Sequence, residues 1–173
     1  RSFSTEITDA AELCEQIANF ASTMAEKLRR QKSVVSEMTV FAYTNRFKDN
    51  APQTYGNSLV HFEHPSSDQR TIVSRAVAAA KELYRCGYGY KKAGVVATRL
   101  MQESDLVHSL FEDTSALERE QKLTSALDAI NGAYGKGTVK LAVQGSGHIK
   151  SSSERQSPHY TTLWSDIPAV TVK

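Results

Sequence analysis

Apolar side chains recur at two different spacings along the first hundred residues, which predicts a mixture of helices and strands. Four runs are rich in alternating, β-branched or aromatic side chains and predict strands at residues 1–7, 34–44, 58–63 and 91–100. Two other runs repeat apolar side chains three and four positions apart, which predicts helices at residues 10–31 and between Pro65 and Gly87. Both parities of 34–44 carry apolar side chains, so the pattern leaves open which face of that strand is buried.

Each helical run has a start signal and one apolar face. Asp9 and Glu12 have the spacing of a capping box, and Asp68 closes a Ser-Ser-Asp cluster before the second run. The inward face of the first helix is expected to hold Leu13, Ile17, Phe20, Met24 and Leu28. The inward face of the second is expected to hold Ile72, Val73, Ala76, Val77, Ala80, Leu83 and Tyr84.

The resulting element order, β-α-β-β-α-β, predicts an α+β domain over residues 1–104. This order gives a four-stranded antiparallel sheet with both helices on one face. The other face of the sheet is then free to meet a partner. A polar connector at residues 105–115 and a small α/β C-terminal extension at residues 116–173 are expected to follow.

The extension is expected to begin with a helix and to continue with a strand. Ser115 and Glu118 have the spacing of a second capping box, and Gly135 is a suitable helix stop. The inward face of this helix is expected to hold Leu117, Leu123, Leu127 and Ile130. Residues 138–144 alternate in polarity and predict a strand. The aromatic side chains either stack on nucleobases or close the core of the extension; they are Tyr134, Tyr160 and Trp164.

The net charge of +2 is small, but positive charge is concentrated in the first part of the chain. Residues 1–104 carry 14 Lys and Arg against 11 Asp and Glu, whereas residues 105–173 carry 7 against 8. From Arg85 to Arg99 there are four cations and no carboxylate. Such a run indicates a surface that faces phosphates. The alternative is a solvated basic strand edge that discourages aggregation.

Several classes of protein and of site fit the sequence poorly. No apolar run approaches the ~20 residues that span a bilayer, and no signal peptide is visible. Cys14 and Cys86 form no disulfide framework, which favours a reducing, cytoplasmic compartment. His61 and His64 would face opposite sides of a strand, so no metal site is expected there. No carboxylate cluster and no Ser/His/Asp or Cys/His arrangement indicates catalysis.

Three motifs are spread over the chain: RSFS at residues 1–4, GYGYKKAGV at residues 87–95, and the pair GKGT and SPHYTT at residues 135–138 and 157–162. Together they resemble the C-terminal part of bacterial Y-family DNA polymerases of the UmuC type, which act in error-prone translesion synthesis during the SOS response. The first two resemble the start and end of the little-finger domain, and the last pair resembles the extension specific to the UmuC type. The resemblance implies that this chain is a piece of a longer protein.

In a little finger the free sheet face lies along the primer–template duplex and holds its phosphates. Phosphate contacts carry no sequence information, which suits a polymerase that must grip damaged and undamaged templates alike. The resemblance and the small or basic side chains together nominate Arg1, Ser2, Ser4, Arg46, Lys91, Lys92 and Arg99 as DNA-binding residues, with Lys48 as a further candidate. Val96 stands where related domains often place a basic residue. The alternative for these residues is a solvated strand or loop.

The resemblance also implies protein partners. In the family, the connector can carry a Gln-Leu-x-Leu-Phe peptide that docks on the sliding clamp. Here Leu110 and Phe111 match its apolar anchors, and Val107 replaces its glutamine. The alternative is that Leu110 and Phe111 pack on the domain itself. UmuD-type subunits and RecA are further expected partners, and a module that mainly docks to proteins is the alternative function.

The catalytic carboxylates of the family lie in the palm domain, upstream of Arg1. Mg²⁺ is therefore expected in the parent polymerase, and this region is expected to hold no cofactor of its own and to be inactive alone.

Overall fold

The protein is described by a computed structural model that places residues 1–48, 50–106 and 114–146. Its elements are β1 (Ser2–Ile7), α1 (Ala10–Arg30), β2 (Ser33–Thr44), β3 (Tyr55–Ser66), α2 (Gln69–Leu83), β4 (Tyr90–Gln102), the 3₁₀ turn η1 (Glu103–Asp105), α3 (Thr114–Tyr134) and the 3₁₀ turn η2 (Ala142–Gln144). None of the described helices is both long and apolar enough to cross a membrane.

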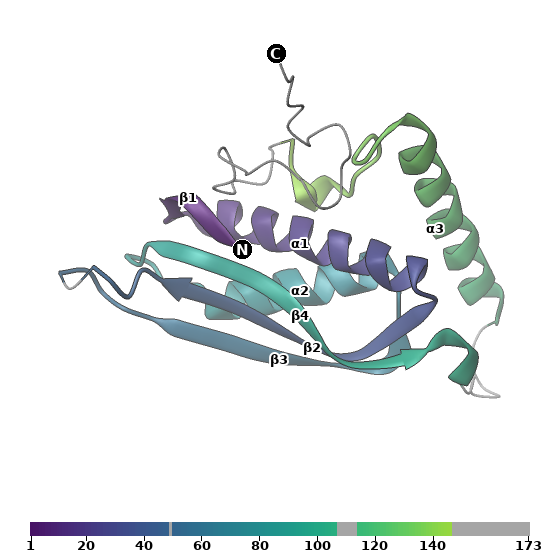
Figure 1. The fold of residues 1–173 in the computed structure, drawn as a ribbon, viewed down its shortest axis with the longest axis horizontal. Helices are drawn as coiled ribbons and strands as arrows, with labels where there is room; N and C mark the ends of the chain where they lie inside the picture. Colours follow the sequence, from purple (N-terminus) through teal and green to yellow (C-terminus); the bar gives the residue numbers. More distant parts are fainter. Residues whose placement is uncertain (49, 107–113, 147–173) are drawn as a thin grey trace, which may run out of the picture.

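The first six helices and strands form a two-layer α+β domain. The sheet has four strands in the order β1-β4-β2-β3, and every neighbouring pair is antiparallel. Helices α1 and α2 lie on the same side of this sheet, and no described element covers the other side (Figure 1). The predicted fold class and the predicted free sheet face are therefore confirmed for the described residues.

Both helices of this domain begin where the sequence predicts. The Asp9 carboxylate accepts a hydrogen bond from the Glu12 amide at 2.9 Å, and the Asp68 carboxylate accepts one from the Thr71 amide at 2.8 Å. These contacts satisfy amides that have no partner inside the helix. The predicted inward faces are also confirmed, because their residues are buried or pack against the buried core.

The core lies between the helices and one face of the sheet. From Met38 onward, the even-numbered side chains of β2 are buried against the helices. Phe3 and Ile7 anchor the edge strand β1 to the same core, and neither side chain is exposed to solvent. From Glu37 onward, the odd-numbered side chains of β2 therefore point to the uncovered face, which settles the question that the apolar pattern left open. Val35 is buried because it precedes an irregularity in the strand pairing.

Residues 138–144 do not form the strand that their alternation predicts; they form a bend followed by η2. Two side-chain amides satisfy the backbone here in place of a neighbouring strand. Asn131 accepts from the Val139 amide at 2.9 Å and donates to the Val139 carbonyl at 3.1 Å. Gln144 accepts from the Leu141 amide at 2.9 Å. Because side chains already pair these backbone N–H and C=O groups, the segment does not require hydrogen bonds to a neighbouring strand.

The expected inward face of α3 is also wrong in its described part. Leu123 and Ile130 are exposed and Leu127 is half-buried, whereas Thr124 of the same helix is buried. The polar side of α3 faces the rest of the protein because its partners there are charged: Asp128 binds Arg29 of α1. The helix does end at Tyr134, and Gly135 follows with a φ of 104°, as the helix stop predicts.

Some predicted features lie outside the described residues. They are the clamp-binding residues Val107, Leu110 and Phe111, the side chains of Ser115, Leu117 and Glu118, and the segment 147–173 with Tyr160 and Trp164.

The two thiols are expected to differ in reactivity. Cys14 is buried in α1, and burial raises the pKa of its thiol, whereas Cys86 is exposed after α2. Because the thiolate is the reactive species, a disulfide reagent at neutral pH should label Cys86 rapidly in the native protein and reach Cys14 only after unfolding. Peptide mass spectrometry would locate the label; equal rates at the two cysteines would contradict this prediction.

Candidate nucleic-acid interface

The uncovered sheet face, termed the open face, carries its side chains in rows that cross the strands. The strand pairings and the alternation of side chains define these rows. From one end of the sheet to the other they are Tyr55–Tyr43–Lys92–Ser2, Asn57–Phe41–Gly94, Leu59–Thr39–Val96 and His61–Glu37–Arg99. The open face is therefore cationic at the corner beside β1 and aromatic or apolar toward β3.

Five of the predicted DNA-binding residues come together at this corner. Ser2 pairs with Lys92 across the two strands, and the Lys91 ammonium donates to the Ser4 carbonyl at 3.0 Å. Arg1 joins them, because its carbonyl accepts from the Ala93 amide at 3.1 Å. These five residues, Arg1, Ser2, Ser4, Lys91 and Lys92, are termed the basic corner.

The positive charge of the basic corner is not compensated by the described part of the chain. Neither Lys91 nor Lys92 has a carboxylate partner among the described residues. Ser2 and Ser4 add small side chains on the same face, which lets another backbone or a phosphate approach closely. This arrangement suits an anionic ligand.

Arg46 lies in the loop between β2 and β3, and Arg99 lies near the far end of β4. The Lys48 ammonium contacts the Glu6 carboxylate at 3.0 Å, which brings the loop that carries Arg46 beside β1. Arg99 is separate, and its guanidinium lies 3.3 Å from Glu37. Of the seven predicted DNA-binding residues, five therefore form the basic corner, Arg46 lies in a loop close to it, and Arg99 lies at the other end of the sheet.

The far row of the open face is largely neutralised. Glu37 lies between Arg99 and His61, and the His61 imidazole is 3.5 Å from the same carboxylate oxygen. No three His, Cys, Asp or Glu side chains of the described ranges come close enough to hold a metal ion.

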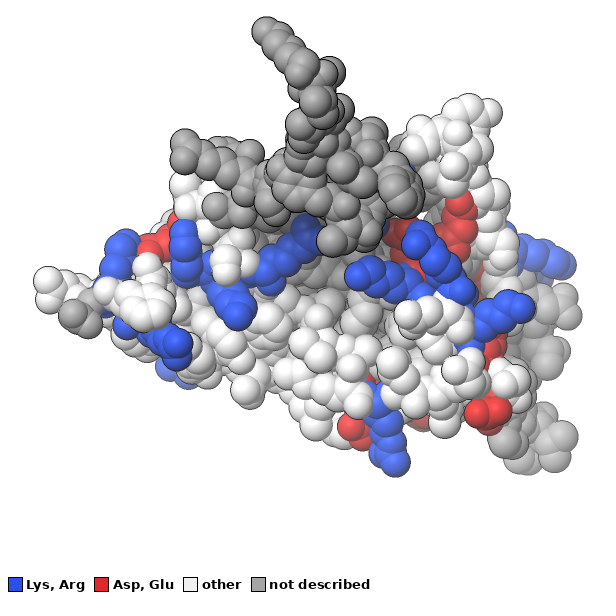
Figure 2. Space-filling model, viewed as in Figure 1, with Lys and Arg blue, Asp and Glu red and all other residues white. Residues whose placement is uncertain are grey.

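Figure 2 shows Lys and Arg in a band over α1 and the adjoining strand edges, while the lower part of the view is mostly uncharged.

Sequence reasoning missed the aromatic side chains of the open face. Tyr43 and Tyr55 stand directly opposite each other with ring centroids 4.4 Å apart, and Phe41 lies 5.0 Å from Tyr43. The alternation of β3 contained a signal for this surface, because Tyr55, Leu59 and His61 are at odd-numbered positions and so share one face of the strand. It could not be used while the buried face of β2 was undetermined.

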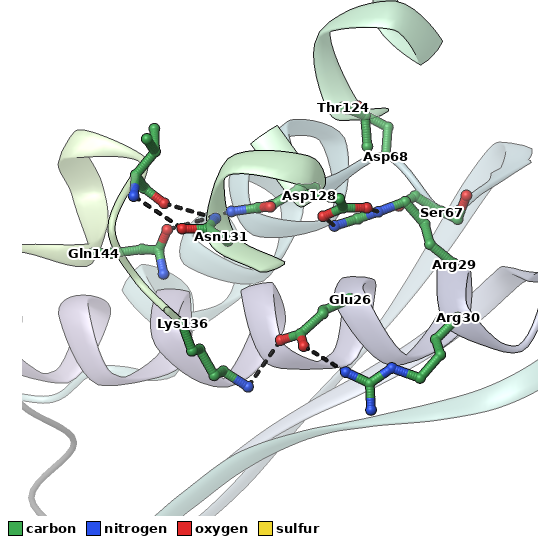
Figure 3. A network of polar contacts seen from close by, with 12 residues as sticks. Glu26, Arg29, Arg30, Ser67, Asp68, Thr124, Asp128, Asn131, Lys136 and Gln144 are labelled. Atoms are coloured by element: carbon green, nitrogen blue, oxygen red, sulfur yellow. Dashed lines mark hydrogen bonds and ion pairs between the residues drawn. The ribbon is translucent and has the colours of Figure 1, made fainter. Parts of the chain in front are cut away.

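The described part of the C-terminal extension lies on the helical side, away from the open face. Arg29 forms two hydrogen bonds of 2.6 Å with the Asp128 carboxylate and donates to the Ser67 carbonyl at 3.0 Å (Figure 3). Asn19 and Gln144 exchange hydrogen bonds of 3.0 and 3.2 Å between α1 and η2. The described part of the extension therefore leaves the open face accessible.

Two family models match different parts of the chain. Residues 1–110 match the model of the impB/mucB/samB family C-terminal domain, and residues 121–170 match a domain of unknown function. Protein UmuC of Salmonella typhimurium is 35% identical over 96% of this chain and 40% of its own length. Protein ImpB of Salmonella typhimurium is 33% identical over 97% of this chain and 40% of its own length. Protein MucB of Escherichia coli is 29% identical over 100% of this chain and 41% of its own length. The chain spans about 40% of the length of these relatives.

Proposed function

Because the chain belongs to the impB/mucB/samB C-terminal domain family, we propose that it is the DNA-gripping part of a translesion DNA polymerase. The polymerase activity itself, with its Mg²⁺, belongs to the longer protein in this proposal. The part described here is non-catalytic and binds the backbone of primer–template DNA without sequence preference. Its role is to hold damaged and undamaged templates equally well.

The basic corner is the observation that carries this proposal. Its two lysines have no described carboxylate partner. Lys92 lies on a sheet face that no described element covers, and Lys91 lies beside it and contacts the edge strand β1. Neutralising phosphates with such lysines releases the counterions of the DNA, and this release drives binding whatever the sequence. The small side chains of Ser2 and Ser4 leave room for the DNA backbone beside the lysines.

A second candidate function is docking to other proteins. The observation in its favour is the exposed apolar flank of α3, where Leu123, Ile130 and Tyr134 face solvent. The sliding clamp, UmuD-type subunits and RecA are the partners proposed for this role. Substituting Leu110 and Phe111 with alanine would test the clamp contact separately from DNA binding.

Reversing the charge of the basic corner tests the DNA-gripping function. Lys91→Glu with Lys92→Glu should lower the affinity for primer–template DNA at low salt about tenfold or more. It should also reduce the slope of log K against log salt by about two, because each lysine that contacts a phosphate contributes about 0.9 to this slope. Fluorescence anisotropy over a range of salt concentrations would measure both effects.

The matched control reverses two cations on the helical side. Arg75 and Lys81 are exposed on α2, so Arg75→Glu with Lys81→Glu changes the net charge equally, away from the open face. This variant should keep most of the affinity and the full salt slope. Three results would refute the proposal: no binding at low salt, binding indifferent to salt, or an equal loss in the control.

A further inference from the structure

The aromatic side chains of the open face form a continuous row beside the basic corner. The rings of Tyr43 and Tyr55 are stacked at 4.4 Å with an interplanar angle of 23°, and the ring of Phe41 follows at 5.0 Å. These three residues, which come from two adjacent rows of the open face, are termed the aromatic row. Tyr55 ends the row on β3 and remains 59% exposed, so an aromatic surface is available to a ligand.

The aromatic row contributes little to the core of the domain. Its side chains point away from α1 and α2, whose contacts with the sheet come from the opposite parity. Leu59 and Val96 extend the apolar surface two rows further and are about half exposed. A contiguous exposed patch of this kind, on a face already flanked by cations, marks a binding surface.

The neighbours of the row indicate a nucleic acid. Lys92 stands directly opposite Tyr43 on β4, so a positive charge adjoins the aromatic surface. Aromatic rings on a sheet beside a cation match the two halves of a nucleotide, since the rings accept the base and the ammonium accepts the phosphate. Asn57, in the next row on β3, adds an amide to the same surface.

The base faces that such a row needs are hidden inside a duplex. Stacked base pairs cover one another, whereas unpaired nucleotides present a free face that any aromatic ring can accept. We therefore infer that the aromatic row binds unpaired nucleotides of a DNA strand whose duplex part is held at the basic corner. This inference rests on the proposed DNA-gripping function and adds a second kind of ligand to the same face.

The test compares three DNA ligands with the 173-residue chain: a dT homopolymer, a primer–template with a single-stranded overhang, and a blunt duplex. Tyr55→Ala should lower the affinity for the homopolymer about tenfold, the effect typical of losing one base-stacking contact. Its affinity for the blunt duplex and its salt slope should stay unchanged, because no phosphate contact is removed. Tyr55→Phe should retain homopolymer binding, because the ring is kept.

Val143→Ala is the control, since this apolar side chain is exposed on η2, outside the open face. It should leave all three affinities unchanged. A mapping experiment does not depend on how the variants fold: a dT strand that carries 5-iodouracil should photo-crosslink to the peptide containing Tyr55. Crosslinks confined to peptides outside β2 and β3 would overturn the inference.

The outcomes separate the two proposals. If Tyr55→Ala leaves homopolymer binding intact while the Lys91 and Lys92 reversals still weaken duplex binding, the inference fails and the DNA-gripping function stands. An equal loss for homopolymer and duplex in Tyr55→Ala would also overturn the inference, because stacking requires an unpaired base. If the unmodified protein binds none of the three ligands at low salt, both proposals fail.

Discussion

Phe3→Ala is expected to lower the free energy of unfolding by about 3–5 kcal/mol, the cost of emptying a fully buried aromatic site. Phe3 has no exposed surface, and its ring stacks on Phe20 of α1 with the centroids 6.3 Å apart. It sits in an edge strand of only six residues that pairs with β4 alone. Ile7 is the other buried apolar side chain of β1, so the surrounding structure cannot collapse around the cavity at Phe3 without moving the strand.

Denaturant unfolding of Phe3→Ala would measure this loss. The same variant should bind DNA more weakly where it remains folded, because the strand that Phe3 anchors carries Ser2 and Ser4 of the basic corner. Phe47→Ala is the matched control, since it removes the same ring from a loop position that is 82% exposed. Its effect should stay within about 0.5 kcal/mol. Similar losses in the two variants would contradict the packing of β1 described here.

The helices of the first domain could be predicted closely because their signals are local. A helix expected at residues 10–31 is observed at Ala10–Arg30. Its start depends on Asp9, which binds an amide only three residues away. Its buried face follows from a spacing that the chain carries within a few turns. Signals of this range are fully present in the sequence.

The central strand β2 shows where local signals fail. It lies between β3 and β4, and both of its faces carry apolar side chains such as Val40 and Phe41. Only the assembled sheet shows that Val40 packs on the helices while the ring of Phe41 lies over Gly94 of β4. The aromatic row could therefore not be predicted, because its exposure depends on which face the helices cover.

The extension was harder to predict because its partners are distant in the sequence. Asp128 binds Arg29, which lies 99 positions earlier, and Asn19 binds Gln144 at a separation of 125 positions. An apolar stripe at helical spacing normally marks the buried side of a helix. In α3 these polar contacts decide the orientation instead, and they leave Leu123 and Ile130 exposed.

The Arg29–Asp128 contact is expected to hold α3 against α1. Asp128→Ala should lower the free energy of opening α3 by about 2–3 kcal/mol, somewhat below the cost of breaking a fully buried ion pair, because Asp128 is partly exposed. Arg29→Met should have a smaller effect. It leaves behind a carboxylate that water can reach, whereas Asp128→Ala leaves a guanidinium whose side chain is only 14% exposed. Hydrogen exchange of the α3 amides would measure the free energy of opening in the two variants.

The ion pair between Arg30 and Glu26, both on α1, supplies the control. Arg30 lies 2.9 Å from Glu26, but its side chain is 75% exposed, so Arg30→Met should change the opening of α3 by less than about 0.5 kcal/mol. The double variant Arg29→Met with Asp128→Ala should cost less than the sum of its parts, because each single change already removes the shared contact. Additive losses, or an equal effect of Arg30→Met, would show that α3 is held by something other than this ion pair. In that case the attachment would have to be assigned to the other ion pairs between the extension and the domain, Arg70–Glu120 at 3.1 Å and Lys136–Glu26 at 2.8 Å.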